Sequence, residues 1–249
     1  MHLKDATILV VDDEPDWRSI IADWFKREGS CVLLAENGAE ALNMIHTNRV
    51  DVVVSDVRMP VMDGITLLKN IKASEGYKPS VMFISGFSDI EPGEAYDLGI
   101  EAMMPKPVER KQLISAVTRI LAERDELWRL SPSDKAEALL DANFGSLAEA
   151  LSEGLLAFGR AGFCIHSTLN LREGPVNLLL IFEADKRKVI GRGIVRWIAP
   201  TKAEIGVEIT YIDDDNRAWI ISLTGPNKSL SFIPRTSPRV TPPAMKARV

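Results

Sequence analysis

The sequence has few cysteines, few histidines and no long apolar segment. Cys31 and Cys164 are its two cysteines, far apart and within apolar runs, so we expect buried free thiols and neither a disulfide framework nor a zinc site. The three histidines are scattered, and no catalytic triad or metal-ligand spacing can be assembled from them. No apolar run approaches the roughly 20 residues that span a bilayer. Residues 1–5 lack a signal-peptide pattern, which predicts a cytoplasmic protein without a membrane span.

Charge is distributed unevenly along the 249 residues. Residues 1–125 carry 14 basic and 21 acidic side chains, whereas residues 126–249 carry 16 and 14. An acidic first half argues against nucleic acid as its ligand. Residues 225–249 contain five basic residues, several prolines and no acidic residue. We expect this tail to be disordered, and because no recognition helix accompanies it, binding of nucleic acid is not expected.

The first half alternates short apolar runs with amphipathic helical patterns. This alternation predicts a doubly wound parallel α/β sheet over residues 1–128. The predicted strands are 7–11, 31–35, 50–54, 81–84 and 102–104, and the predicted helices are 16–28, 39–47, one beginning after Gly64, 89–98 and 109–128.

Polar side chains follow the ends of four of these strands. Asp12 and Asp13 follow the first, Asp56 the third, Ser85 the fourth and Lys106 the fifth. Taken singly, each is an ordinary turn or surface residue, but the carboxyl ends of parallel strands meet at one sheet edge. Carboxylates forced together resist ionisation unless a cation is present, and Mg²⁺ prefers such oxygen ligands. At the end of a strand we expect Asp56 to be exposed and rigidly held, and with a lysine and a hydroxyl beside it, it is predicted to accept a phosphoryl group.

These residues stand in motifs that resemble the receiver domain of two-component response regulators. The motifs cover about residues 5–125 and read Asp12-Asp13, Ser55-Asp56-x-Arg58-Met59-Pro60-x-Met62-Asp63-Gly64, Ser85-Gly86 and Lys106-Pro107. The resemblance implies a flavodoxin-like (βα)5 fold with strand order 2-1-3-4-5. It also implies that a histidine kinase or phosphotransfer protein phosphorylates Asp56, and that the receiver can form a homodimer.

The resemblance further assigns a role to each residue of the site. It implies that Asp13, Asp56 and the backbone carbonyl of Arg58 ligate Mg²⁺, while Asp12 acts through a bound water. Ser85 is implied as the switch hydroxyl and Lys106 as the partner of the phosphate. One position departs from the pattern, because Met103 stands where the family has an aromatic switch residue. A flexible methionine has no ring that could move inward and outward. We therefore expect that this domain does not transmit the signal by the family's usual ring motion.

The second half shows a different pattern, in which a helical segment is followed by strands. We expect residues 129–158 to form a helical linker, followed by a small mainly-β barrel over residues 159–224. Predicted strands cover 163–168, 176–182, 189–199 and 203–211, and residues 217–223 are either a fifth strand or a closing helix.

The glycines and alternating apolar residues of this half resemble a PilZ domain. The matching segments are Gly159-Arg160-Ala161-Gly162-Phe163-Cys164-Ile165, Val176–Phe182 in alternation, Gly193-x-Val195-x-Trp197 and Ile205-Gly206-Val207-Glu208-Ile209. Many PilZ domains bind cyclic di-GMP, but the family's Arg-x-x-x-Arg arm is missing upstream. Its Asp/Asn-x-Ser-x-x-Gly motif aligns with Ala157, Gly159 and Gly162 and keeps only the last glycine.

We therefore expect a phosphorelay response regulator that is not an enzyme, with output by protein contact through a degenerate PilZ-like domain. The alternative is a cyclic di-GMP effector whose affinity is tuned by phosphorylation of the receiver.

Overall fold

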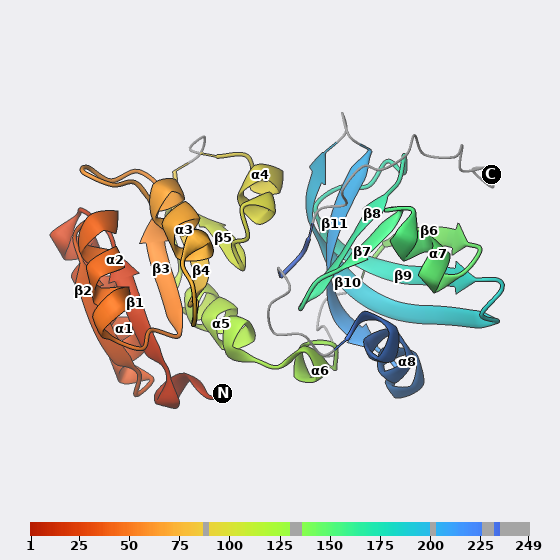
Figure 1. The fold of residues 1–249 in the computed structure, drawn as a ribbon, viewed down its shortest axis with the longest axis horizontal. Helices are drawn as coiled ribbons and strands as arrows, with labels where there is room; N and C mark the ends of the chain where they lie inside the picture. Colours follow the sequence, from red (N-terminus) through yellow and green to blue (C-terminus); the bar gives the residue numbers. More distant parts are fainter. Residues whose placement is uncertain (87–89, 130–135, 200–202, 226–231, 235–249) are drawn as a thin grey trace. The chain divides into compact units, whose positions relative to one another are not determined.

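The computed structural model describes residues 1–86, 90–129, 136–199, 203–225 and 232–234. The chain divides into two compact units, Met1–Ala122 and Glu123–Val249 (Figure 1). Within the described ranges, no helix has the length and apolar character needed to cross a membrane.

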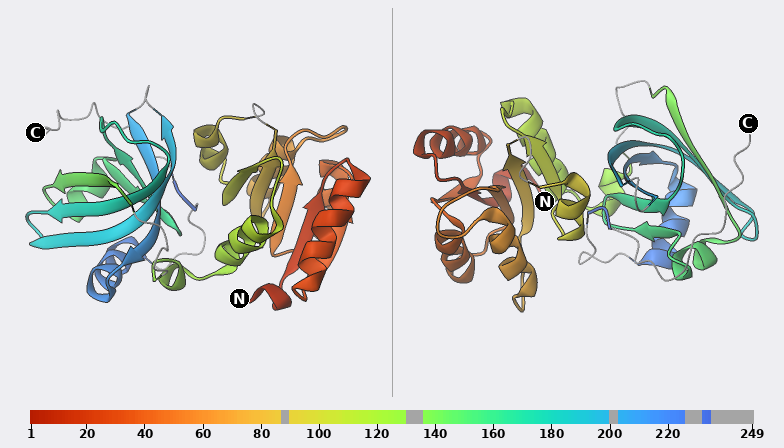
Figure 2. Two further views of the ribbon diagram at one scale, coloured as in Figure 1. Left: turned by 180° about the vertical axis from the view of Figure 1, so that it is seen from behind. Right: turned by 90° about the horizontal axis from the view of Figure 1, so that it is seen from above.

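The first unit is a five-stranded parallel sheet with helices on both faces (Figures 1 and 2). Its strand order, β2-β1-β3-β4-β5, confirms the predicted flavodoxin-like receiver fold. The strands are β1 (Thr7–Val11), β2 (Cys31–Ala35), β3 (Val52–Asp56), β4 (Ser80–Ser85) and β5 (Ala102–Pro105). The helices are a 3-10 turn at Leu3–Asp5, α1 (Pro15–Arg27), α2 (Gly38–Thr47), α3 (Gly64–Ala73), α4 (Pro92–Asp97) and α5 (Arg110–Leu121).

Burial explains why the central strands are continuous apolar runs. Every residue of β3 is buried, and so are the last four residues of β1. A parallel strand that is covered by helices on both faces needs apolar side chains on both faces. The main core lies between the sheet and the helices α1 and α5, which contribute Phe25 and Leu113 to it.

The predicted helix 109–128 is two helices that belong to different units. Helix α5 ends at Leu121, because Ala122 takes an extended conformation, and α6 (Arg124–Leu127) follows. Trp128 is buried, and its carbonyl accepts a hydrogen bond from Ile212 of the second unit. The end of the predicted helix therefore packs in the second unit, where Trp128 contacts Phe158, and does not continue α5.

The second unit is a curled, mixed six-stranded sheet (Figure 2). Strand order is β6-β9-β10-β11-β8-β7; β6 runs parallel to β9 and the other neighbours are antiparallel. The elements are β6 (Ala138–Phe144), α7 (Leu147–Ser152), β7 (Leu156–Phe158), β8 (Gly162–His166), β9 (Gly174–Phe182), β10 (Arg187–Ala199), β11 (Glu204–Ile212) and α8 (Asp214–Thr224). Residues 217–223 thus lie in a helix rather than a fifth strand.

The prediction of a helical linker over residues 129–158 is wrong. This segment supplies both edge strands of the sheet, β6 and β7. In β6, Leu140, Ala142 and Phe144 are buried and the residues between them are exposed, which is the two-residue period of a strand. Residues 130–135 lie outside the described ranges.

Two further expectations need comment. Cys164 is a buried free thiol as predicted, but Cys31 is exposed, because it is the first residue of β2, a strand at the edge of the sheet. The predicted disorder of residues 225–249 falls mostly outside the described residues. Phe232 and Ile233, which are described, are buried, and the carbonyl of Phe232 accepts a hydrogen bond from Ala161.

Candidate functional site

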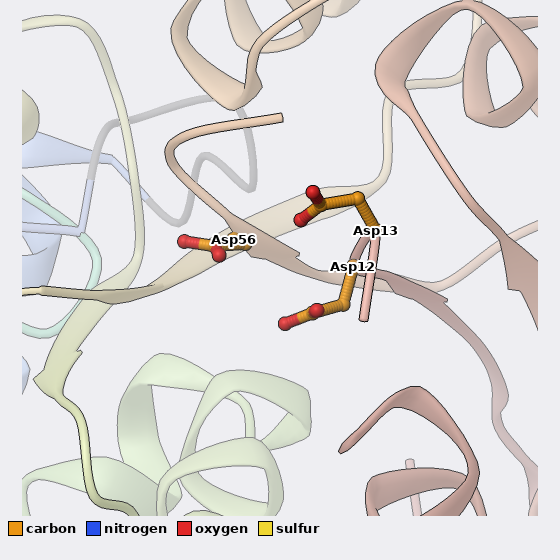
Figure 3. Close-up of side chains that lie close together, drawn as sticks. All are labelled: Asp12, Asp13 and Asp56. Atoms are coloured by element: carbon orange, nitrogen blue, oxygen red, sulfur yellow. The ribbon is translucent and has the colours of Figure 1, made fainter. Parts of the chain in front are cut away.

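Three carboxylates meet at the carboxyl edge of the first unit's sheet. Asp12 and Asp13 directly follow β1, and Asp56 is the last residue of β3. Each side chain offers one oxygen, and these atoms lie within 4.8 Å of one another. Figure 3 shows the three side chains gathered at this edge. The convergence predicted from the strand ends is therefore present.

Lys106 brings a positive charge to this group. Its Nζ lies 2.7 Å from Oδ2 of Asp56, 3.2 Å from Oδ2 of Asp12 and 3.8 Å from Oε1 of Glu14. Burial by itself would lower the pKa of Lys106, but the hydrogen bond to Asp56 and the charges of Asp12 and Asp56 raise it above its ordinary value. The ammonium group therefore stays charged at neutral pH and beyond.

Asp56 is more enclosed than we expected from its place at a strand end. We expected an exposed carboxylate, but only 10% of its side chain is accessible. The reason is that β3 extends through Asp56, with Lys106 against Oδ2 and the backbone N–H of Val57 donating to Oδ1 at 2.6 Å. The exposed member of the three is Asp13. Asp56 is consequently held in one orientation by opposite contacts on its two oxygens.

Ser85 ends β4 opposite Pro105 of β5, and it is buried. Its Oγ makes no hydrogen bond in the described part of the chain. A buried hydroxyl without a partner costs about 1–3 kcal/mol, so this site is suited to an oxygen-rich ligand that the hydroxyl can contact.

Burial makes ionisation of Asp12 unfavourable. It raises the pKa of this carboxyl group, against the opposing effects of the Glu14 backbone N–H and of Lys106, and the charge of Asp56 adds a smaller increase. The donor set fits a divalent cation, which would stabilise the buried carboxylates in their ionised form.

We expect ionisation of Asp12 to destabilise the metal-free protein. A carboxyl group with a raised pKa in the folded state binds its proton more tightly there than in the unfolded chain. Its contribution to the free energy of unfolding therefore falls as pH rises from about 4 toward neutrality. In EDTA, the free energy of unfolding of wild type minus that of Asp12→Asn should decrease over this range, as measured by urea denaturation. A difference that grows with pH would contradict the assignment.

Other residues of the motif take the places that the sequence suggests. The N–H of Arg58 lies 3.4 Å from Oδ1 of Asp56, while ligation of a metal by the Arg58 carbonyl stays a prediction. Met103 lies opposite Phe83 in the β4–β5 register. Its neighbours Ala102 and Met104 pack against the main core, so Met103 points to the other face of the sheet.

Two contacts were missed by the sequence reasoning. Glu14 lies near Lys106, and a guanidinium nitrogen of Arg18 donates to the backbone carbonyl of Asp12. Glu14 precedes α1, and Arg18 lies in its first turns. Only the path of the chain from β1 into α1 brings them to the site, and nothing in their spacing marks them.

Comparisons with known proteins assign the first unit. Residues 8–118 match the family model described as the response regulator receiver domain. The chain is 32% identical over 133 residues to the transcriptional regulatory protein GlrR of Escherichia coli K12, covering 52% of this chain and 30% of GlrR. It is 33% identical over 125 residues to the DNA-binding transcriptional regulator NtrC of the same organism, covering 50% of this chain and 26% of NtrC. It thus spans about a third or less of the length of these relatives.

Solved structures of receiver domains match a little less than half of the chain. The receiver domain of the Francisella response regulator 1452 is 32% identical and aligns with a TM-score of 0.44, covering 47% of this chain and 96% of that one. The family model and the acidic edge both fall within the first unit. Residues 8–118 are therefore the receiver domain of a two-component response regulator.

Proposed function

We propose that this chain is a phosphorelay response regulator that is phosphorylated on Asp56 by a histidine kinase or a phosphotransfer protein. The observation that carries the proposal is the placement of Asp56 between Lys106 and two further carboxylates at one sheet edge. In the proposed step, an oxygen of Asp56 attacks the phosphorus of a phosphohistidine. The new O–P bond forms while the N–P bond breaks, and its electron pair stays on the departing imidazole nitrogen.

The chain's own residues orient the groups that react. The backbone N–H of Val57 donates to Oδ1 of Asp56, and Lys106 contacts Oδ2. After transfer, the ammonium group of Lys106 would pair with a negatively charged oxygen of the phosphoryl group. The hydroxyl of Ser85, which has no hydrogen-bond partner among the described residues, would donate to another phosphoryl oxygen. We propose that Asp12, Asp13, Asp56 and the Arg58 carbonyl hold Mg²⁺. The ion, when bound, supplies charge neutralisation between the carboxylates and the phosphoryl group.

The proposal is tested by labelling with acetyl phosphate. The full chain should take up one phosphoryl group in the presence of Mg²⁺, and EDTA should reduce labelling to background, because the carboxylates then repel the incoming phosphate. The label is followed by intact-mass spectrometry and located by peptide mapping. Labelling that is indifferent to EDTA, or that maps away from Asp56, would contradict the proposal.

We further propose that the second unit is a degenerate PilZ-like module, without catalytic activity of its own, whose output is contact with a protein. The turn that aligns with the family's nucleotide motif supports this reading. The N–H of Gly159 donates to the carbonyl of Gly162, so residues 159–162 form a tight turn without a polar side chain at the motif positions. A Cβ at Gly162 would lie 1.9 Å from the carbonyl oxygen of Val207, so packing alone accounts for this glycine.

A further inference from the structure

The outer face of the curled sheet in the second unit exposes apolar side chains. Among the described residues of this unit, five large hydrophobic side chains are exposed, and three of them lie on this face. They are Leu139 on β6, Ile190 on β10 and Tyr211 on β11, with exposed fractions of 50%, 59% and 41%. The inner face, in contrast, carries the buried core residues of the same strands.

Strand register places these side chains together. Leu139 and Arg192 both lie opposite Asn177 of β9, and Tyr211 lies opposite Arg192. Residues directly opposite each other in a sheet point to the same face. In the next row, Ile190 lies opposite Leu179. Figure 1 shows the long strands β9 and β10 running side by side in this unit.

Basic side chains flank the apolar centre. Lys188 and Arg192 stand two residues before and after Ile190 on β10, so all three point to the same face. Both are exposed, and neither forms an ion pair with any part of the chain that the structure describes. Arg196, further along β10, is paired with buried Glu208. The acidic residue of these rows is Asp141, which lies on the edge strand β6 opposite Leu179.

We call this surface the outer patch; its members are Leu139, Leu179, Lys188, Ile190, Arg192 and Tyr211. We propose that the outer patch binds an acidic segment with apolar side chains, presented by a partner protein. This inference rests on the proposed function, in which the second unit signals by protein contact, and it names the surface that does so.

The make-up of the outer patch decides between occupants. Protein interfaces commonly have an apolar centre with aromatic side chains such as tyrosine, and arginine is enriched in them. Unpaired basic groups select an acidic partner and repel a basic one. The chain's own tail, residues 225–249, carries five basic residues and no acidic one, so it is disfavoured here. A membrane surface is a weaker fit, because two basic side chains attract anionic lipid only modestly.

The test selects peptides from a phage-displayed random library on the immobilised full chain. Selected peptides are then synthesised, and their affinities for the full chain are measured by fluorescence polarisation. We expect them to carry net negative charge together with leucine, isoleucine or aromatic residues. Ile190→Glu and Arg192→Glu should each weaken binding about tenfold or more, since one removes the apolar centre and the other reverses a selecting charge.

Matched controls separate the patch from general effects. Leu223→Glu changes a side chain of α8 that is also half exposed, and Arg172→Glu reverses an exposed charge outside the patch. Both should bind the peptides as the wild type does. Circular dichroism checks the fold of each variant, and Arg192→Glu remains informative if Ile190→Glu does not fold.

Four results would overturn the inference. The first three are the absence of any selected peptide, selection of neutral or basic peptides, and binding that Arg192→Glu leaves unchanged. A fourth is patch-dependent binding to vesicles of phosphatidylglycerol and phosphatidylcholine in place of peptide, which would assign the face to lipid. Labelling of Asp56 by acetyl phosphate is measured on the same variants. Its failure in the wild type would count against the proposed function, whereas a wild type that is labelled but binds no selected peptide would count against the outer patch alone.

Discussion

Asp56→Asn should abolish labelling of the full chain by acetyl phosphate. An asparagine has nearly the shape of the aspartate and can still accept the Val57 N–H on its carbonyl oxygen. Its amide, however, is not a nucleophile toward phosphorus, and it presents no second oxygen to Lys106. We expect intact-mass spectrometry to show labelling at background, with the circular dichroism spectrum of the wild type.

Asp63→Asn is the matched control for this variant. Asp63 lies on the same loop, and its carboxylate caps α3 by accepting the N–H of Thr66. An asparagine can serve as such a cap, so both stability and labelling should remain close to those of the wild type. Undiminished labelling of Asp56→Asn, with the label on another carboxylate of the acidic edge, would place the acceptor elsewhere.

Gly64→Ala should destabilise the receiver domain and slow its phosphorylation together. A Cβ at this position would lie 2.3 Å from the backbone carbonyl oxygen of Asp56 and 3.2 Å from the Oγ of Ser55. The obstacle is backbone at the end of a fully buried strand, so either α3 must move away or Asp56 must shift. We expect a loss of about 2–3 kcal/mol in the free energy of unfolding, measured by urea denaturation.

The effect on labelling distinguishes a local clash from general instability. Gly76→Ala is the comparison, because a Cβ there meets nothing within 4 Å and only its positive φ, 87°, is strained. It should cost about 1 kcal/mol and leave the labelling rate unchanged. If Gly64→Ala labels at the rate of the wild type, the contact between α3 and Asp56 does not set the geometry of the acceptor.

Much of the receiver domain could be predicted from the sequence because its signals are local. Each parallel strand is a short apolar run, and each site residue stands at the end of one. Once Asp12, Asp56 and Lys106 are placed on strands of a doubly wound sheet, the topology brings them to a single edge. That edge forms as predicted, with Lys106 between Asp56 and Asp12.

Errors arose where one local pattern could serve two partners. The helix predicted over residues 109–128 joins two elements, because α5 ends at Leu121 and Trp128 packs against Phe158 of the second unit. The alternation of Leu140, Ala142 and Phe144 is short, and only pairing with β9, more than thirty residues away, makes it a strand. Secondary-structure propensity and hydrophobic periodicity describe one segment by itself, and they do not indicate which other element will pack against it.

The sequence alone determined which side chains this protein brings to its acidic edge, because each of them directly follows or ends an apolar run that forms a strand. Tertiary structure alone decided how enclosed Asp56 is, that the buried hydroxyl of Ser85 finds no partner among the described residues, and which apolar side chains of the second sheet are exposed. The physical reason is that burial and pairing belong to contacts between distant segments. No residue carries that information by itself.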